Sequence, residues 1–151
     1  MAQWHKAILA AAVGIAVATV GGMAIAQADI IKARQEGMKG NGRAMKELKQ
    51  IIDAGGPASA AVKPAESIAA MSAKIPGAFP KGSDKGDTKA KPEIWANWAD
   101  FEKHASNSKA AAEKLVADAK GGSMDMVKAD FKALGQTCGA CHKLYRVPEQ
   151  H

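Results

Sequence analysis

One stripe of residues 29–53 keeps the spacing of an α-helix face. Its members are mostly large and apolar: Ile31, Arg34, Met38, Asn41, Met45, Leu48 and Ile52. This pattern predicts an amphipathic helix of about six turns, which the Gly-Gly-Pro sequence at residues 55–57 ends. Arg34 and Asn41 are polar residues on a stripe that should be buried, so their presence there needs an explanation.

The rest of the chain predicts three more helices and one long loop. Residues 58–74 carry a weaker helical pattern, and residues 76–92, rich in Gly, Pro, Lys and Asp, read as a loop. A third helix is expected over residues 92–120, and Ser123 is a suitable N-cap for a fourth that ends at Pro148. With no strand pattern, the sequence predicts an all-α, antiparallel four-helix bundle.

The N-terminus has the composition of a secretory signal peptide. Lys6 precedes a long uncharged run, rich in Ala and Gly, that ends in Ala-Ile-Ala at Ala26. A cut after Ala26 or Ala28 would leave the bundle, residues 27–151, as the mature domain. A retained membrane anchor is the alternative, because the run is nearly long enough to span a bilayer. We expect cleavage, a periplasmic location and no stable membrane insertion afterwards.

The net charge of the chain excludes few classes of binding partner. The formal net charge is +6 at pH 7, which suits nucleic acid, anionic lipid or an acidic protein. No block of Lys and Arg reaches five in a row, so a nucleic-acid-binding arm is not supported. The lysines are expected to form a solvated face.

The sequence CGACH near the C-terminus contains both cysteines of the chain, Cys138 and Cys141, followed at once by His142. A redox dithiol normally opens a helix after a strand, whereas this pair lies far inside a predicted helix. A structural zinc site needs four ligands, and no further cysteine exists to complete one. A disulfide between these positions would have poor geometry on a helix.

Covalent haem attachment uses every part of this motif. Positions i and i+3 share one helix face, so Cys138 and Cys141 can both bond a single porphyrin. His142 can then supply an axial ligand to the iron. The sequence therefore predicts one covalent haem c with its iron.

The sequence also resembles the class II c-type cytochromes, the cytochrome c′ family, over essentially the whole mature chain. CGACHKLYR lies near the C-terminus, as in that family, and the first predicted helix contains the family's Arg-Gln pair, followed after three places by the apolar Met38. The Lys-Pro-x-Ile-Trp sequence at residues 91–95 matches as well. The run MKGNGRAM is more similar to the low-spin, cytochrome c-556 type of member.

Bundle geometry indicates which residue faces the other side of the iron. The first and fourth helices should be antiparallel neighbours, so a haem near the end of the fourth faces the early part of the first. Met38 and Met45 are seven residues apart, roughly 10 Å along the helix. Only one can reach the iron, and we expect Met38 to be the sixth ligand and Met45 a core residue. In high-spin members of the family the residue at the Met38 position leaves the iron five-coordinate.

Two arginines are candidates for the haem pocket. Arg34 lies one turn before Met38 and could donate hydrogen bonds to a haem propionate. Arg146 resembles the family's basic residue beside the axial imidazole, although it could equally serve as a charge that complements the helix dipole. Trp95, Trp98, Phe101 and Phe131 are expected in the core, and His104 in solvent.

These features predict a periplasmic mono-haem cytochrome that carries single electrons between protein partners with acidic docking surfaces, and that is not an enzyme. A homodimer is possible. The main alternative is a five-coordinate cytochrome c′ that binds NO or CO. A haem-free dithiol protein is a remote third reading.

Overall fold

The structure is a computed structural model that describes residues 16–148, with side chains described from residue 27. Its helical elements are α1 (Ala16–Asp53), η1 (Ala58–Ala61), α2 (Val62–Lys74), η2 (Pro76–Ala78), α3 (Glu93–Ala96), α4 (Trp98–Lys120) and α5 (Met124–Tyr145). Within the described residues there is no strand, and the one isolated β-bridge pairs Ala90 with Arg146. The prediction of an all-α fold is confirmed.

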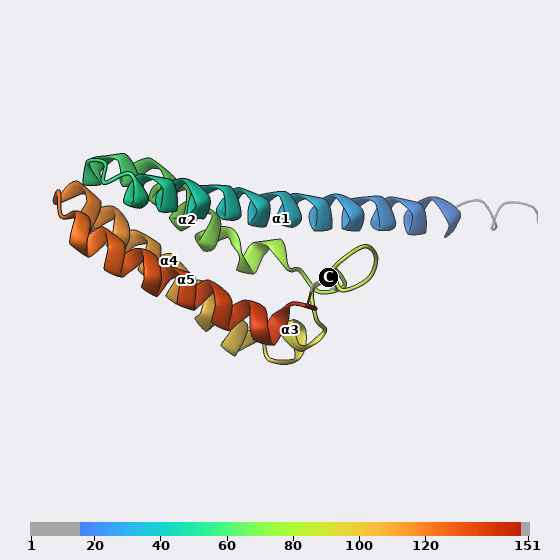
Figure 1. The fold of residues 1–151 in the computed structure, drawn as a ribbon. Coiled ribbons are helices and arrows are strands. Elements are labelled where there is room, and N and C mark those ends of the chain that lie inside the picture. The colour runs from blue at the N-terminus through green and yellow to red at the C-terminus, as the bar shows by residue number, and fades with distance from the viewer. Residues whose placement is uncertain (1–15, 149–151) are drawn as a thin grey trace, which may run out of the picture.

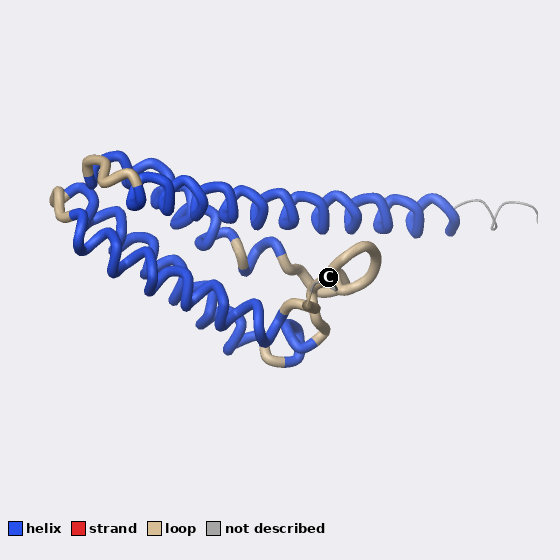
Figure 2. Tube along the Cα trace, viewed as in Figure 1, coloured by secondary structure: helices blue, strands red, loops and turns tan. Residues whose placement is uncertain are grey.

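The four long helices run up and down in an antiparallel bundle (Figure 1). The connections α1–α2 and α4–α5 lie together at one end of the molecule, at the left in Figures 1 and 2. From there α1 and α5 diverge, so they are well separated at the end that holds the C-terminus. The most extensive packing joins α2 to α4 and α4 to α5. We call the two ends the closed end and the open end.

The first helix is longer than predicted at its N-terminus. It ends at Asp53, as expected, but begins at Ala16 and runs without a break through both suggested cleavage positions. Most of the predicted signal peptide, residues 1–15, lies outside the described residues, so its removal stays a prediction. No helix within residues 16–148 is long and apolar enough to cross a membrane.

The third predicted helix is in fact two, and the prediction of one continuous helix from Pro92 was wrong. Asn97 separates α3 from α4 with a non-helical backbone, φ −121° and ψ 47°. Its backbone N–H and its side-chain amide both donate to the carbonyl of Glu93, at 2.9 and 3.3 Å. An Asn side chain that bonds nearby backbone competes with helix continuation, which accounts for the break.

The predicted N-cap of the fourth helix is confirmed, whereas α2 begins at Val62 rather than at residue 58 and α5 ends at Tyr145, before Pro148. The Ser123 side chain accepts a hydrogen bond from the Met126 N–H at 3.3 Å and so caps α5. Residues 58–61, predicted as the start of the second helix, form a 3₁₀ turn directly before α2. Gly55 and Gly122 have positive φ values of 61° and 82°, which suit the turns that follow α1 and α4.

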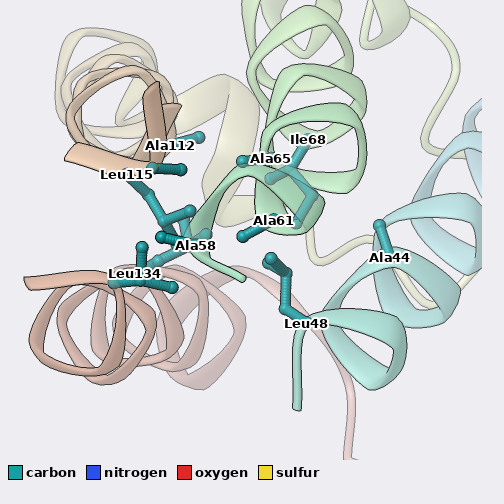
Figure 3. Close-up of a cluster of buried hydrophobic side chains, with 11 residues drawn as sticks. Ala44, Leu48, Ala58, Ala61, Ala65, Ile68, Ala112, Leu115 and Leu134 are labelled. Carbon is teal, nitrogen blue, oxygen red and sulfur yellow. The ribbon is translucent and has the colours of Figure 1, made fainter. Parts of the chain in front are cut away.

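The closed end is filled by small and aliphatic side chains (Figure 3). We call this cluster the closed-end core: Ala44, Leu48, Ala58, Ala61, Ala65, Ile68, Ala112, Leu115, Ala119, Val127 and Leu134. Leu48 from α1, Leu115 from α4 and Leu134 from α5 point toward one another around η1. The many alanines let the helix backbones approach closely, so direct helix-to-helix packing closes this end.

The open end has a second cluster, the open-end core, with a different composition: Ile75, Phe79, Ile94, Phe101, Ala105 and Tyr145. Trp95 and Trp98 pack against it, whereas Phe131 packs against the closed-end core. The core role predicted for these aromatic residues is therefore confirmed. Phe101 is the centre of the open-end core, with ring centroids 5.0 Å from Phe79 and 5.4 Å from Tyr145.

Candidate functional site

The C-terminal half of α5 carries the Cys-x-x-Cys-His sequence, whose two cysteines lie on the inner side of the bundle. Cys138 and Cys141 are both free thiols and both half-buried. Cys138 packs against the closed-end core and Cys141 against the open-end core, so the pair lies where the two cores meet. Three-residue spacing on a helix brings the two sulfurs to one face, as attachment to a single flat group requires.

The surroundings of the two thiols keep them protonated. Burial raises the pKa of Cys141 to about 11, with further contributions from the charges of Cys138 and Asp100. Burial also raises the pKa of Cys138, against the lowering effect of hydrogen bonds with Thr137 and Ser108. A nucleophilic dithiol needs the opposite shift, so this environment does not suit a thiolate redox centre.

His142 follows Cys141 but turns toward the surface, where its side chain is exposed. Desolvation, followed by the positive charge of Arg146, lowers its pKa, so the neutral imidazole that can ligate a metal is favoured. Within residues 16–148, no three His, Cys, Asp or Glu side chains gather closely enough to hold a bare metal ion. Cys138, Cys141 and His142 therefore do not form a shared metal site in this arrangement.

The structure separates the two methionines of the α1 stripe. Met38 is half-buried against the open-end core, the same cluster that Cys141 contacts. Met45 packs against the closed-end core, which confirms its predicted core role. Of the two, Met38 is thus the methionine that shares an environment with the second cysteine of the motif.

Arg34 is buried, only 3% exposed, and its guanidinium makes four hydrogen bonds. Nη1 donates to Ser83 Oγ at 2.7 Å and to the Ala78 carbonyl at 3.5 Å. Nη2 donates to the Ser83 carbonyl and to Thr88 Oγ1, both at 2.7 Å. The guanidinium carbon also lies 4.5 Å from the centre of the Phe79 ring. Arg34 is therefore fixed by the long loop that precedes α3.

The partners of Arg34 offer a test of whether a haem fits this end of the bundle. All of them are neutral, and no carboxylate within the described residues forms an ion pair with it. Burial lowers its pKa for this reason. A buried cation without a counter-charge is unfavourable, so an anionic group such as a propionate would complement it. Because the four terminal N–H groups already have acceptors, the fit rests on charge and on the remaining Nε–H, and the propionate role of Arg34 stays a prediction.

Arg146 ends α5 and is half-buried. It pairs with Ala90 of the long loop through the isolated β-bridge. Its charge contributes, after desolvation, to the lowered pKa of the His142 imidazole four residues earlier. This places Arg146 beside the motif, whereas a direct contact with haem stays a prediction.

Three polar groups at this end were not singled out from the sequence. Ser83 and Thr88 hold Arg34, and Asp100 accepts a hydrogen bond of 2.6 Å from the hydroxyl of Tyr145. Short polar residues in a loop follow no periodic pattern. The one signal in the sequence was Arg34, a cation on a helix stripe that should be buried, which therefore needs polar partners. The expectation of a solvated His104 was wrong: its side chain is 20% exposed, 3.6 Å from Asp100.

A four-helix bundle with a free Cys-x-x-Cys-His sequence on its last helix defines a class II c-type cytochrome. The family model described as cytochrome c′ matches residues 29–146. The chain belongs to the cytochrome c′ family, whose members bind haem c covalently, with Cys138 and Cys141 as the two cysteines present here for attachment.

Individual relatives agree with this assignment. A cytochrome c′ from Pararhodospirillum photometricum is 35% identical over 118 residues, which cover 77% of this chain and 94% of that protein. A cytochrome c-556 from Agrobacterium tumefaciens (strain II Chrys) is 37% identical over 119 residues, covering 78% and 96%. A solved cytochrome c′ described as having an unusual ligand-controlled dimer dissociation is 31% identical, covers 81% of this chain and 97% of that one, and superimposes with a TM-score of 0.76.

Proposed function

We propose that the protein is a periplasmic one-electron carrier in which His142 and Met38 are the two axial ligands of a covalent haem c. When bound, the haem supplies an iron that takes up and releases one electron. The observation that carries the proposal is the shared position of Met38 and Cys141 on the open-end core. Met38 of α1 and the second cysteine of the motif on α5 thus pack against the same cluster, which supports the proposed pairing.

The residues around this end have distinct roles in the proposal. Cys138 and Cys141 hold the porphyrin, while neutral His142 ligates the iron from the helix that carries them. Met38 supplies a soft second ligand, which raises the reduction potential relative to a five-coordinate iron. Arg34 supplies a positive charge for a propionate. The aromatic residues of the open-end core exclude water, which strengthens each of these electrostatic interactions.

The basic character of the chain indicates the kind of redox partner. The full chain has a formal charge of +6, and removal of residues 1–26 takes away only one charged side chain, Lys6, so the mature protein stays basic; it should associate fastest with a protein that presents an acidic surface, and salt should slow that association. A periplasmic location would follow from removal of residues 1–26. A homodimer is also possible, since one solved relative is described by its dimer dissociation.

An absorption spectrum of the ferric holoprotein tests the ligation. We expect a sulfur-to-iron band near the red end of the visible spectrum in the wild type. Met38→Leu should abolish this band and give a high-spin spectrum, because leucine fills the same volume without a donor atom. Met45→Leu is the matched control and should keep the band, since Met45 packs in the closed-end core.

A high-spin wild-type protein in both oxidation states would refute the proposed ligation. It would favour the alternative function, a five-coordinate protein that binds NO or CO. A band that survives in Met38→Leu but disappears in Met45→Leu would show that Met45, and not Met38, is the ligand.

A further inference from the structure

The long loop between η2 and α3 touches both helices that carry the proposed axial ligands. We call residues 79–92 the bridging loop. At the open end α1 and α5 diverge (Figure 1), so direct packing does not fix the distance between them there. The bridging loop contacts α1 on one side and the end of α5 on the other. It is therefore in a position to set the spacing of the two helices.

The attachment to α1 is made one turn before Met38. Arg34 bonds Ser83 and Thr88 of the loop, as described above, at 2.7 Å in each case. Gln35 adds a hydrogen bond of 2.9 Å from Nε2 to the Asp87 carbonyl. Because the guanidinium is buried and its two terminal nitrogens are both used, this attachment is rigid and directional.

The attachment to α5 begins three residues after His142 and uses backbone groups. The Lys91 N–H donates to the Tyr145 carbonyl at 3.0 Å, and the Val147 N–H donates to the Lys89 carbonyl at 2.8 Å. Between these two bonds Ala90 and Arg146 form the antiparallel bridge. A short two-stranded connection thus fastens the loop to the end of the haem-bearing helix.

Thr88 joins the two attachments. Its Oγ1 accepts from Arg34 at 2.7 Å and also from the backbone N–H of Ala90 at 3.1 Å. A single hydroxyl therefore links the cation on α1 to the residue that pairs with α5. Phe79 of the loop makes an edge-to-face contact with Phe101, and Phe101 in turn contacts Tyr145 in the same way.

We infer that the bridging loop is a strap that positions Met38: it holds α1 at the distance from α5 at which the thioether can stay bound to the iron. The inference rests on the proposed His142/Met38 ligation. It assigns Arg34 and Thr88 as positioning residues that act through Met38, whether or not Arg34 also bonds a propionate. Loss of the hydrogen bonds to α1, of those to α5, or of the Thr88 link between them should release Met38 and open the sixth coordination position.

The hydrogen bonds of the strap can be removed by substitutions that leave Met38 and His142 unchanged. Thr88→Val removes the shared hydroxyl with little change of volume. Val147→Pro removes the N–H that bonds Lys89, and the extended backbone of Arg146, φ −120° and ψ 135°, tolerates a following proline. Val147→Ala keeps that N–H and is the matched control. Arg34→Lys keeps the charge but loses the fork of donors, and Arg43→Lys, at an exposed position of the same helix, controls for it.

The holoprotein variants are compared by the rate of CO binding to the ferrous form and by the ferric sulfur-to-iron band. CO must wait for Met38 to leave, so its binding rate reports the fraction of open iron. We expect Thr88→Val, Val147→Pro and Arg34→Lys each to speed CO binding by about tenfold. This is the factor that corresponds to loss of one hydrogen bond to a charged group. The band should weaken in each, while Val147→Ala and Arg43→Lys resemble the wild type.

Amide hydrogen exchange of residues 79–92 supplies a readout that does not depend on haem chemistry. Exchange in the loop should accelerate in Thr88→Val and in Val147→Pro. Faster exchange with unchanged CO binding would overturn the strap, because the loop would then be loosened without consequence for Met38. Exchange at the wild-type rate in both variants would overturn it too, since these bonds would not hold the loop. A wild type without the band refutes the ligation itself, which separates the two failures.

Discussion

The two ends of this bundle are built on different principles. The closed-end core consists of alanines, leucines, valine and isoleucine, and joins the helices by direct contact. The open-end core is smaller and rich in aromatic side chains, and at this end the bridging loop hydrogen-bonds both α1 and α5, in addition to the direct Phe101–Tyr145 contact between α4 and α5. The closed end therefore depends mainly on apolar helix-to-helix packing, whereas the open end depends on the hydrogen bonds of a loop as well.

The difference is sharpest for substitutions that create a cavity. Leu115 is fully buried in the closed-end core. Leu115→Ala should lower the free energy of unfolding by about 3 kcal/mol, because it removes apolar contacts and leaves a cavity among packed helices. Urea denaturation of the holoprotein, followed by circular dichroism, measures the change. The visible spectrum should stay that of the wild type.

Leu144 gives the matched comparison at the open end. It is a leucine on α5 that is 47% exposed. Leu144→Ala should change the free energy of unfolding by about 0.5 kcal/mol or less, as expected for a surface site. Equal losses of stability at Leu115 and Leu144 would show that Leu115 is not packed in a closed-end core as the structure has it.

The open-end core contains one titratable side chain, Tyr145. Burial, followed by its hydrogen bond to Asp100 and the charge of that carboxylate, raises the pKa of Tyr145 from 10.0 to about 12. Neutral Tyr145 therefore stabilises the fold below pH 10, and this contribution is lost as the pH rises from about 10 to about 12. Tyr145 is the only tyrosine of the chain, so the ultraviolet absorbance of tyrosinate reports it without ambiguity.

Asp100→Asn sharpens this test. It removes the negative charge but keeps an oxygen that can accept the hydrogen bond, so the pKa of Tyr145 should fall part of the way toward its ordinary value. A complete return is not expected, since burial is the largest cause of the shift. Titration of Tyr145 at its ordinary pKa in the wild type would show that the open-end core is more hydrated than its packing indicates.

A modest effect is expected at the turn of the closed end. Ser123→Ala removes the side-chain oxygen that accepts from the Met126 N–H. The free energy of unfolding should fall by about 1 kcal/mol, the usual cost of losing an N-cap. Thermal denaturation measures it, with Ser59→Ala as a control at an exposed serine without a capping hydrogen bond. No change in the spectrum is expected, because the cap lies at the end opposite Met38.

Helical periodicity was enough to predict the bundle and the inner stripe of α1. That stripe already separated Met38 from Met45 by two turns, and the structure assigns them to different cores. The break at Asn97 could not be predicted in this way, because one residue's local hydrogen bonds outweighed a continuous helical pattern. Periodicity indicates which face of a helix is buried, but it does not indicate where the backbone leaves the helical conformation.

The bridging loop shows a second limit of the sequence. Arg34 stood out as a cation on a buried stripe, yet its partners Ser83 and Thr88 are about fifty residues away, in a segment without any periodic pattern. Contacts of this kind depend on the packing of the whole bundle, which a local pattern does not contain. The sequence could therefore indicate that Arg34 needs partners, and only the structure names them.

Nuclear magnetic resonance of the ferrous holoprotein with ¹³C-labelled methionine methyl groups tests the central claim most directly. A methyl group bound through sulfur to low-spin iron lies above the porphyrin plane, where the ring current moves its signal far upfield. We predict one such signal, present in the wild type and in Met45→Leu and absent in Met38→Leu. A spectrum in which every methionine methyl lies in the ordinary range would contradict ligation by Met38.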